Sequence, residues 1–295
     1  MTKRPILYLL DGSSYIYRAF FALPHLSSAS GLPTNASLGF TNMLLKMLKD
    51  KSPEYMAVIF DAKGPTFRHE LYESYKITRP PMPYNLSSQI PYIKEIVEGL
   101  NIPMLELEGY EADDIIATIC KEMENKEYKV IVITGDKDLF QLVSKNVTLW
   151  DSMKNKVSGL VEVKERFEIE PHQIPDVMGL TGDSIDNVPG IPGIGEKTAI
   201  RLIKEFQSIE NLLDNIDQIP KEKLKANLRR YKDQALLSKE LVTLKSDVPV
   251  ACDLKHLKVK SPDRTKLRKL FKELEFTRLL KETEPEESQD HLRFK

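Results

Sequence analysis

Acidic residues stand at the ends of successive apolar segments in this chain, where several carboxylates could meet in space. Three such acids follow runs that are typical of buried strands: Asp11 after ILYLL, Asp61 after MAVIF and Asp136 after VIVITG. In an open parallel sheet the carboxyl ends of the strands line one edge, and ligands bind outside that edge. Carboxylates crowded there would repel one another unless cations neutralised them. Hard oxygen ligands in such number suit Mg²⁺ or Mn²⁺.

The full set of candidate metal ligands comes from five short motifs, YLLDGSS, VIFDAKG, YEADD, TGDKD and TGDSIDN. Their acids are Asp11, Asp61, Glu111, Asp113, Asp114, Asp136, Asp138, Asp183 and Asp186. Each acid alone has an alternative explanation, because Asp is also a common turn residue and helix N-cap. The repetition of the pattern favours a metal site for the set as a whole.

The acids of YEADD stand at the start of a predicted helix, EADDIIATICKEM. Positions i and i+2 point apart on a formed helix, so Glu111 and Asp113 can share a site only if Glu111 lies at or before the N-cap. The helix dipole also favours carboxylates at this position. A capping role therefore stays open as an alternative, most of all for Asp114.

A glycine-rich turn followed by a basic helix forms a second candidate site. The segment PGIPGIGEKTAIRLIKEF spans 189–206 and contains Gly190, Gly193, Gly195, Lys197 and Arg201. Backbone amides at such a turn and helix N-terminus can bind an anion. The spacing matches a hairpin between two helices that grips a DNA backbone phosphate without reading bases. It is no phosphate loop of the GxxxxGK[ST] type, and a turn that only caps a helix is the alternative.

Basic and aromatic residues supply further candidates. The stretch 74–85, SYKITRPPMPYN, contains three prolines and cannot form one continuous helix. Lys76 and Arg79 in this stretch, with Lys63 and Arg68 before it, form a basic rim in the sequence, although a solvated surface would look the same. Tyr17 belongs to an aromatic group just after Asp11, and an aromatic ring beside a metal site could stack on an unpaired base.

Strand and helix patterns alternate in the first part of the chain, which predicts a mainly parallel α/β sheet with right-handed crossovers. The predicted strands are 6–10, 56–60, 103–107, 130–134 and 147–150, and the helices between them include 36–49, 87–99 and 112–124. Only helical periodicity follows, over 171–181, 196–206, 208–214, 221–244 and 263–280. We therefore expect an α/β domain over 1–170, a helical part over 171–280 with its hairpin at 188–197, and an acidic linker or tail over 281–295.

Composition narrows the class of protein. The chain has 295 residues, 41% hydrophobic and 29% charged, which is typical of a soluble globular protein. The net charge of −1 neither supports nor excludes a polyanionic partner, because metal bound to the acids would leave a basic surface elsewhere. Two cysteines give no disulfide framework or zinc pattern, and no segment has the pattern of a membrane span or secretory signal. A cytoplasmic protein with no membrane partner is expected.

Five long motifs resemble the 5′-nuclease domain of bacterial DNA polymerase I, a member of the flap-endonuclease superfamily. They are LDGSSYIYRAFFA, FDAKGPTFRHELYESYKITRPPMP, EADD, TGDKDLFQLV and MGLTGDSIDNVPGIPGIGEKTA, and the resemblance covers roughly residues 5–280. It implies a PIN-like, mainly parallel sheet flanked by helices. It also implies a helical arch over 74–85 and a C-terminal helical part of the helix-hairpin-helix type.

The resemblance also assigns roles to residues. Asp11, Asp61, Glu111 and Asp113 would hold a first metal ion, and Asp136, Asp138, Asp183 and Asp186 would hold or orient a second, with Asp114 nearby. Lys76 and Arg79 would contact the scissile phosphate from the arch, and Tyr17 would stack on the terminal base. The expected DNA contacts further include Arg68, Gly190, Gly193, Gly195, Lys197 and Arg201. Members of the family also hold K⁺ at the hairpin turn.

The expected function is hydrolysis of phosphodiester bonds at 5′ flaps and nicks by two metal ions, about 4 Å apart, in DNA replication and repair, including RNA primer removal. The expected partners are branched or nicked DNA and RNA-primed DNA, with a polymerase domain in the same parent chain and a monomeric state. Two alternatives remain: a non-catalytic DNA-junction-binding module, and a metal-dependent phosphatase for small phosphate esters. The phosphatase would leave the hairpin and the basic stretch without a role.

Overall fold

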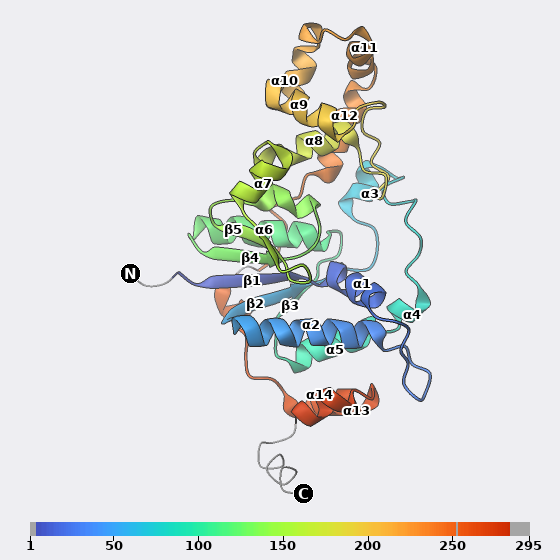
Figure 1. Ribbon diagram of the computed structural model, residues 1–295, viewed down its shortest axis with the longest axis vertical. Helices are drawn as coiled ribbons and strands as arrows, with labels where there is room; N and C mark the ends of the chain where they lie inside the picture. Colours follow the sequence, from blue (N-terminus) through green and yellow to red (C-terminus); the bar gives the residue numbers. More distant parts are fainter. Residues whose placement is uncertain (1–3, 252, 284–295) are drawn as a thin grey trace, which may run out of the picture. The chain divides into compact units, whose positions relative to one another are not determined.

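The computed structural model describes residues 4–251 and 253–283 (Figure 1). Packing divides the chain into two compact units, which we call unit 1 and unit 2. Unit 1 contains 61–81 and 106–251, and unit 2 contains 6–60, 82–105 and the C-terminal helices. Each unit contains some of the strands, and the boundary at 170/171 expected from the sequence stays a prediction. Most of the expected tail over 281–295 lies outside the described residues.

Unit 2 is built on three parallel strands, β1 (Ile6–Asp11), β2 (Tyr55–Ile59) and β3 (Met104–Leu105). β2 lies between the other two, with Leu9 opposite Ala57 on one side and Val58 opposite Met104 on the other. β1 and β2 are almost continuously apolar and buried, as parallel strands covered on both faces are. Their carboxyl ends therefore lie at the same edge of this sheet, where Asp11 closes β1.

The helices of unit 2 cover these strands and one another. They are α1 (Gly12–Ala22), α2 (Asn35–Lys51), α4 (Tyr84–Ser87), α5 (Ile90–Gly99), α13 (Arg264–Glu273) and α14 (Thr277–Glu282). α5 packs against both α2 and α13. Close approach explains one glycine: a Cβ atom on Gly99 would lie 2.9 Å from the side chain of Leu267. A larger residue at this position would push α13 away from α5.

Unit 1 contains β4 (Lys129–Ile133), β5 (Val147–Asp151) and β6 (Lys156–Ser158). β4 and β5 run parallel, and β6 returns antiparallel along β5. The five strands predicted from the sequence are all present in the two units, although β3 is shortened to two residues. β6 was not predicted from the sequence, because it is only three residues long, is largely exposed and has no apolar run.

The rest of unit 1 is helical. In chain order the helices are α3 (Phe67–Leu71), α6 (Ala112–Asn125), α7 (Leu160–Phe167), α8 (Ile174–Thr181), α9 (Glu196–Phe206), α10 (Ile209–Asp214), α11 (Glu222–Arg230) and α12 (Lys232–Val242). α8 packs against α9 and α12. Two expected helices differ from the structure. The helix over 221–244 is interrupted at Tyr231, and the helix over 263–280 is divided into α13 and α14 of unit 2.

The proline-rich stretch is not helical before Tyr84, as its prolines predict, so the helical form of the arch that the family resemblance implied over 74–85 is not found. Between Leu71, where α3 ends, and Tyr84, where α4 begins, the chain forms turns and extended segments and no α-helix. In the part of the chain that the structure describes, no helix combines the length and apolarity needed to cross a membrane. Unit 1 brings acids together at the carboxyl end of β4, at the start of α6 and in the loop between α8 and α9.

Candidate active site

Eight of the nine candidate acids belong to unit 1, and Asp11 belongs to unit 2. Asp11 is 3% exposed, and its Oδ1 accepts a hydrogen bond of 3.0 Å from the backbone N–H of Ser14, so it caps α1. The next residue must be small, because a Cβ atom on Gly12 would lie 2.6 Å from the ring of Phe60. Asp11 thus has the N-cap role that the sequence left open, and its metal role stays a prediction. Tyr17, also in unit 2, is 38% exposed.

Glu111 lies at the N-cap of α6, which is the position that lets it share a site with Asp113 on the first turn. Its Oε1 is 2.5 Å from the Nζ of Lys76. Its Oε2 accepts a hydrogen bond of 3.3 Å from the hydroxyl of Tyr75. The exposed Asp61, just beyond β2, accepts a 2.8 Å hydrogen bond from the first backbone N–H of the same helix. Three expected ligands, Asp61, Glu111 and Asp113, therefore gather at the N-terminus of α6.

Asp114 faces the interior instead. Its two oxygens accept hydrogen bonds of 2.7 and 2.8 Å from the guanidinium of Arg68, and both residues are buried. The backbone N–H groups of Glu111 and Lys245 donate to the same carboxylate. Each oxygen already accepts two hydrogen bonds, so this carboxylate braces α6 and leaves no oxygen for a cation. The expectation that Asp114 helps to hold metal does not match this geometry.

Arg68 also differs from its expected role as a DNA contact. Its side chain is 1% exposed, and beyond Asp114 it donates to the backbone carbonyls of Leu241 and Thr243. Burial lowers the pKa of this guanidinium, but the hydrogen bond with Asp114 and the nearby charge of Glu111 raise it by more. Arg68 is therefore a permanently charged internal brace between α3, α6 and the end of α12.

Asp136 and Asp138 follow β4. The Oδ1 of Asp136 accepts the backbone N–H of Asp138 at 2.9 Å, which closes the turn at the end of the strand. The Oδ1 of Asp138 is buried and accepts no hydrogen bond from any described residue. Burial and the negative charge of Asp136 raise the pKa of Asp138 to about 7, and Asp183 and Asp186 add to the effect. These four carboxylates therefore lie within electrostatic reach of one another.

Asp183 and Asp186 are held in a tight loop between α8 and α9. Asp183 and Val188 exchange backbone hydrogen bonds of 2.9 and 2.7 Å at the base of the loop. Below it, Gly190 has a φ of 58°, and a Cβ atom there would lie 2.2 Å from the backbone nitrogen of Gly182. No residue but glycine fits at this contact, so the glycine of the hairpin also fixes the acidic loop.

Basic side chains of the proline-rich stretch lie directly on these acids. Arg79 donates to Asp186 from Nε at 2.7 Å and also from Nη2. The Nζ of Lys76 lies 3.8 Å from Asp186 in addition to its contact with Glu111. The backbone N–H of Lys76, a residue with a φ of 58°, donates to the carbonyl of Asp186 at 2.9 Å. The structure thus brings both residues expected to act on the scissile phosphate to the acidic site.

Within the described ranges, no three His, Cys, Asp or Glu side chains lie at a spacing that would hold one metal ion as they stand. The oxygens of Glu111 and Asp186 are instead engaged by Lys76 and Arg79. Two features nevertheless fit a divalent cation. The donor set is made of carboxylate oxygens, and Asp138 presents a buried oxygen that no described residue contacts through a hydrogen bond.

The glycine hairpin connects α8 to α9. Gly193 and Gly195 are exposed, as are Lys197 and Arg201 on the first turns of α9. Asn227 donates to the carbonyl of Pro192 at 2.8 Å, and Ser238 accepts the backbone N–H of Gly190 at 3.1 Å. The hairpin is therefore braced from α11 and α12, with its cations directed to solvent.

Tyr75 is a site residue that the sequence analysis missed. Its ring is buried, and its hydroxyl lies between the carboxylates of Glu111 and Asp186, at 3.3 and 3.4 Å. Burial and the charge of Glu111 raise its pKa, so it stays a neutral donor. Tyr75 links the two groups of acids, at α6 and in the α8–α9 loop. Adjacency to Lys76 was the only available signal for it.

Comparison with solved structures identifies the class of fold. The 5′-exonuclease of phage T5 with bound zinc ions superposes with a TM-score of 0.68 at 24% identity, over 82% of this chain and 90% of that one. The catalytic core of Rad2 in complex with DNA substrate superposes at 0.64 and 18%, over 92% and 88%. The fold is the PIN-like α/β fold expected from the sequence, with a helical C-terminal part.

Sequence comparison then gives the family. The model for the N-terminal resolvase-like domain of 5′-3′ exonucleases matches residues 6–168, and the model for their C-terminal SAM fold matches 169–265. The chain belongs to the 5′-3′ exonuclease family. It is 46% identical to a 5′-3′ exonuclease of Aquifex aeolicus over 94% of this chain and 95% of that protein. It is also 46% identical to DNA polymerase I of Bacillus subtilis, of which it spans 32%.

Proposed function

We propose that this chain is a structure-specific 5′ nuclease that hydrolyses phosphodiester bonds at 5′ flaps and nicks in DNA replication and repair, including RNA primer removal. The observation that carries the proposal is the acidic site of unit 1. Lys76 and Arg79 pair with its carboxylates Glu111 and Asp186, and one buried oxygen of Asp138 has no hydrogen-bond partner among the described residues. Branched, nicked and RNA-primed DNA are the proposed substrates. Attachment to a polymerase domain and a monomeric state remain predictions.

Two Mg²⁺ or Mn²⁺ ions are the proposed cofactors. Asp61, Glu111 and Asp113 would hold one ion, with Asp11 retained on its motif alone. The carboxylates after β4 and in the α8–α9 loop would hold the other, namely Asp136, Asp138, Asp183 and Asp186. When bound, such ions would activate a water molecule and stabilise the departing oxyanion. Asp114 is left out of the proposed ligand set, because its oxygens are occupied by Arg68 and two backbone N–H groups.

Lys76 and Arg79 act on the substrate in this proposal. Both now neutralise carboxylates, and a phosphodiester would offer them an alternative anion at the same place. By changing partners they would bring the scissile phosphate onto the acidic site, which would otherwise repel it. Tyr75 would hold Glu111 and Asp186 in place while the side chains of Lys76 and Arg79 move to the phosphate.

The hairpin supplies duplex binding. Gly190, Gly193 and Gly195 would let the backbone approach a phosphate closely, and Lys197 and Arg201 would add charge. A K⁺ ion at this turn stays an expectation from the family resemblance. Such contacts carry no base information, which agrees with a nuclease that recognises DNA structure and not sequence.

A cleavage assay tests the proposal. Equimolar 5′-flap, nicked duplex and single-stranded substrates, labelled at the 5′ end, are incubated with Mg²⁺ and with EDTA. We expect cleavage of the flap and the nick with Mg²⁺, products with a 5′-phosphate and a 3′-hydroxyl, and none with EDTA. Binding to the flap without cleavage under both conditions would instead support the non-catalytic junction-binding module. Release of phosphate from a small ester, with no cleavage of DNA, would support the phosphatase.

A further inference from the structure

Helix α13 of unit 2 carries a row of cations that has no part in the acidic site of unit 1. Arg264, Arg268 and Lys272 recur every four residues, and Lys269 adjoins the row. Residues at this spacing lie on the same side of a helix, about 6 Å apart along its axis. The four side chains, with Thr265 and Thr283, line a hollow of about 540 Å³.

The row is mounted on a firmly held helix. The opposite side of α13 is buried through Leu267, Leu270 and Phe271. The side chain of Asp263 caps the helix by accepting the backbone N–H of Lys266 at 2.9 Å. Substitution of the outer cations would therefore leave the packing of α13 on α5 unchanged.

Most of this positive charge is not neutralised within the protein. The remaining cation of the helix, Lys266, pairs with Glu98 at 2.7 Å, and the acid Glu273 accepts a hydrogen bond from Tyr92. Among the residues that the structure describes, Arg264, Lys269 and Lys272 form no ion pair, and no acid lines the hollow. Exposed cations held side by side attract a polyanion.

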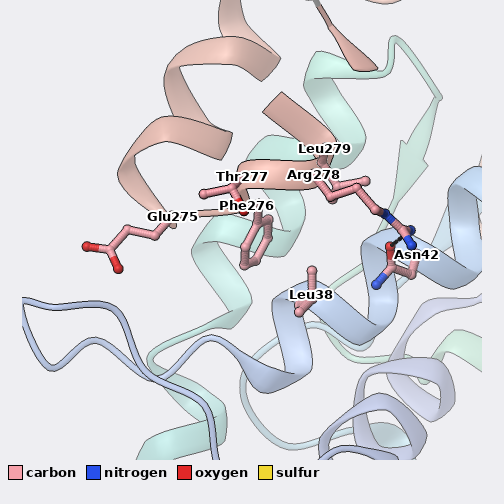
Figure 2. A pocket seen from close by; sticks show the side chains of 7 residues that line it. All are labelled: Leu38, Asn42, Glu275, Phe276, Thr277, Arg278 and Leu279. Carbon is pink, nitrogen blue, oxygen red and sulfur yellow. Dashed lines mark hydrogen bonds between the residues drawn. The ribbon is translucent and has the colours of Figure 1, made fainter. Parts of the chain in front are cut away.

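A neighbouring pocket provides a contrast. A cavity of about 280 Å³ lies between α2 and the start of α14. Figure 2 shows the side chain of Arg278 reaching toward Asn42. Arg278 donates to Asn42 at 3.1 Å and lies 3.6 Å from Glu282, so its charge is already matched. Arg278 thus differs from Arg264, Lys269 and Lys272 on the outer side of α13, for which no ion pair with a described residue is found.

We propose that the outer side of α13 binds the sugar–phosphate backbone of the DNA substrate, as a second contact besides the hairpin. This inference rests on the proposed nuclease function. The hollow offers guanidinium, ammonium and hydroxyl groups, which are the groups that contact phosphate oxygens. Among the described residues that line it, none has an aromatic, amide or carboxylate side chain that would read a base edge. Binding at this face is independent of sequence and strongly dependent on salt.

Salt-dependent binding of a 30-base-pair duplex to the full chain in EDTA tests the proposal. Removing two phosphate contacts by K269A/K272A is expected to lower the slope of log affinity against log salt by about two. The control is K126A/K145A, which removes two exposed lysines from the end of β4 and β5 opposite the acids and should keep the wild-type slope. Circular dichroism verifies that both variants are folded.

A slope for K269A/K272A equal to that of the wild type would overturn the proposal and leave α13 as a solvated basic face or a surface for an acidic protein segment. The outcome is independent of the nuclease assay. If the wild-type chain cleaves flaps and the slope does not change, only the α13 contact fails. If the wild-type chain cleaves nothing, the proposed function fails.

Discussion

Arg68 and Asp114 form a two-pronged ion pair inside unit 1, 46 residues apart in the sequence, with both side chains buried. The pair connects the helix before the proline-rich stretch to the helix that carries Glu111. The carbonyls of Leu241 and Thr243 and the backbone N–H of Lys245 complete it. These backbone groups lie in the last turn of α12 and just after it, so the pair ties the end of α12 to the N-terminus of α6.

Arg68→Ala should lower the free energy of unfolding by about 3–5 kcal/mol, because it leaves the carboxylate of Asp114 buried without its counter-ion. The measurement is urea denaturation followed by circular dichroism. Arg79→Ala is the matched control, since Arg79 pairs with Asp186 at the surface, where such a pair contributes about 0–1 kcal/mol. A similar small loss in both variants would contradict the bracing role.

Sequence could not reveal this pair. Asp114 belongs to the same short motif as Glu111 and Asp113, and Arg68 stands in the same basic run as Lys76, so spacing alone gave them the roles of their neighbours. Burial separates them: one turn of α6 directs Glu111 toward the proline-rich stretch and Asp114 toward the interior. Which face of a helix is buried depends on the elements packed against it, here from 241 onward.

Asp136→Ala should abolish cleavage of a flap substrate and keep the fold. The negative charge of Asp136 helps to raise the pKa of Asp138, so its removal relieves repulsion between the carboxylates. The free energy of unfolding of the metal-free protein should therefore stay the same or rise. Single-turnover cleavage with Mg²⁺ and thermal unfolding in EDTA measure the two effects. Asp217→Ala removes an equal charge from an exposed position of unit 1 and should leave turnover as in the wild type. Unchanged turnover in Asp136→Ala would refute the metal-site assignment.

Lys197→Ala should weaken duplex binding equally for all sequences and lower the salt slope by about one, because a phosphate contact carries no base information. Fluorescence anisotropy with duplexes of different sequence measures this. Lys204→Ala is the control on the same helix, since Lys204 already pairs with Glu168 at 2.6 Å. If single-strand and duplex affinity fell alike in Lys197→Ala, the hairpin would not be the duplex grip.

The elements themselves were largely predictable. Strands such as 130–134 and helices such as 196–206 have strong local patterns, and the structure places β4 and α9 there to within a residue. The hairpin could be predicted from its glycines. The structure shows the reason, because the close backbone contact between Gly190 and Gly182 leaves no room for a side chain. The contacts of Lys76 and Arg79 with Glu111 and Asp186 could not be predicted, because they join residues far apart in the chain.

Removal of the Lys76 side chain should have opposite effects on metal binding and on catalysis. In Lys76→Ala the carboxylate of Glu111 loses a cation 2.5 Å away, so Mn²⁺ should bind the DNA-free protein more tightly. The same variant lacks a group that brings the scissile phosphate onto the site, so turnover should fall more than duplex affinity does. Calorimetric titration with Mn²⁺, single-turnover cleavage and anisotropy measure the three quantities.

Lys63→Ala serves as the control for this comparison. Lys63 precedes the same stretch, is exposed and forms no ion pair with a described residue, so its loss should move none of the three quantities by more than about twofold. Weaker Mn²⁺ binding together with slower cleavage in Lys76→Ala would show that the lysine supports the metal site from outside. In that case it would not compete for Glu111, and the exchange of partners on substrate binding would be refuted. Tighter Mn²⁺ binding with slower cleavage would establish that one side chain neutralises the acids at rest and then acts on the phosphate.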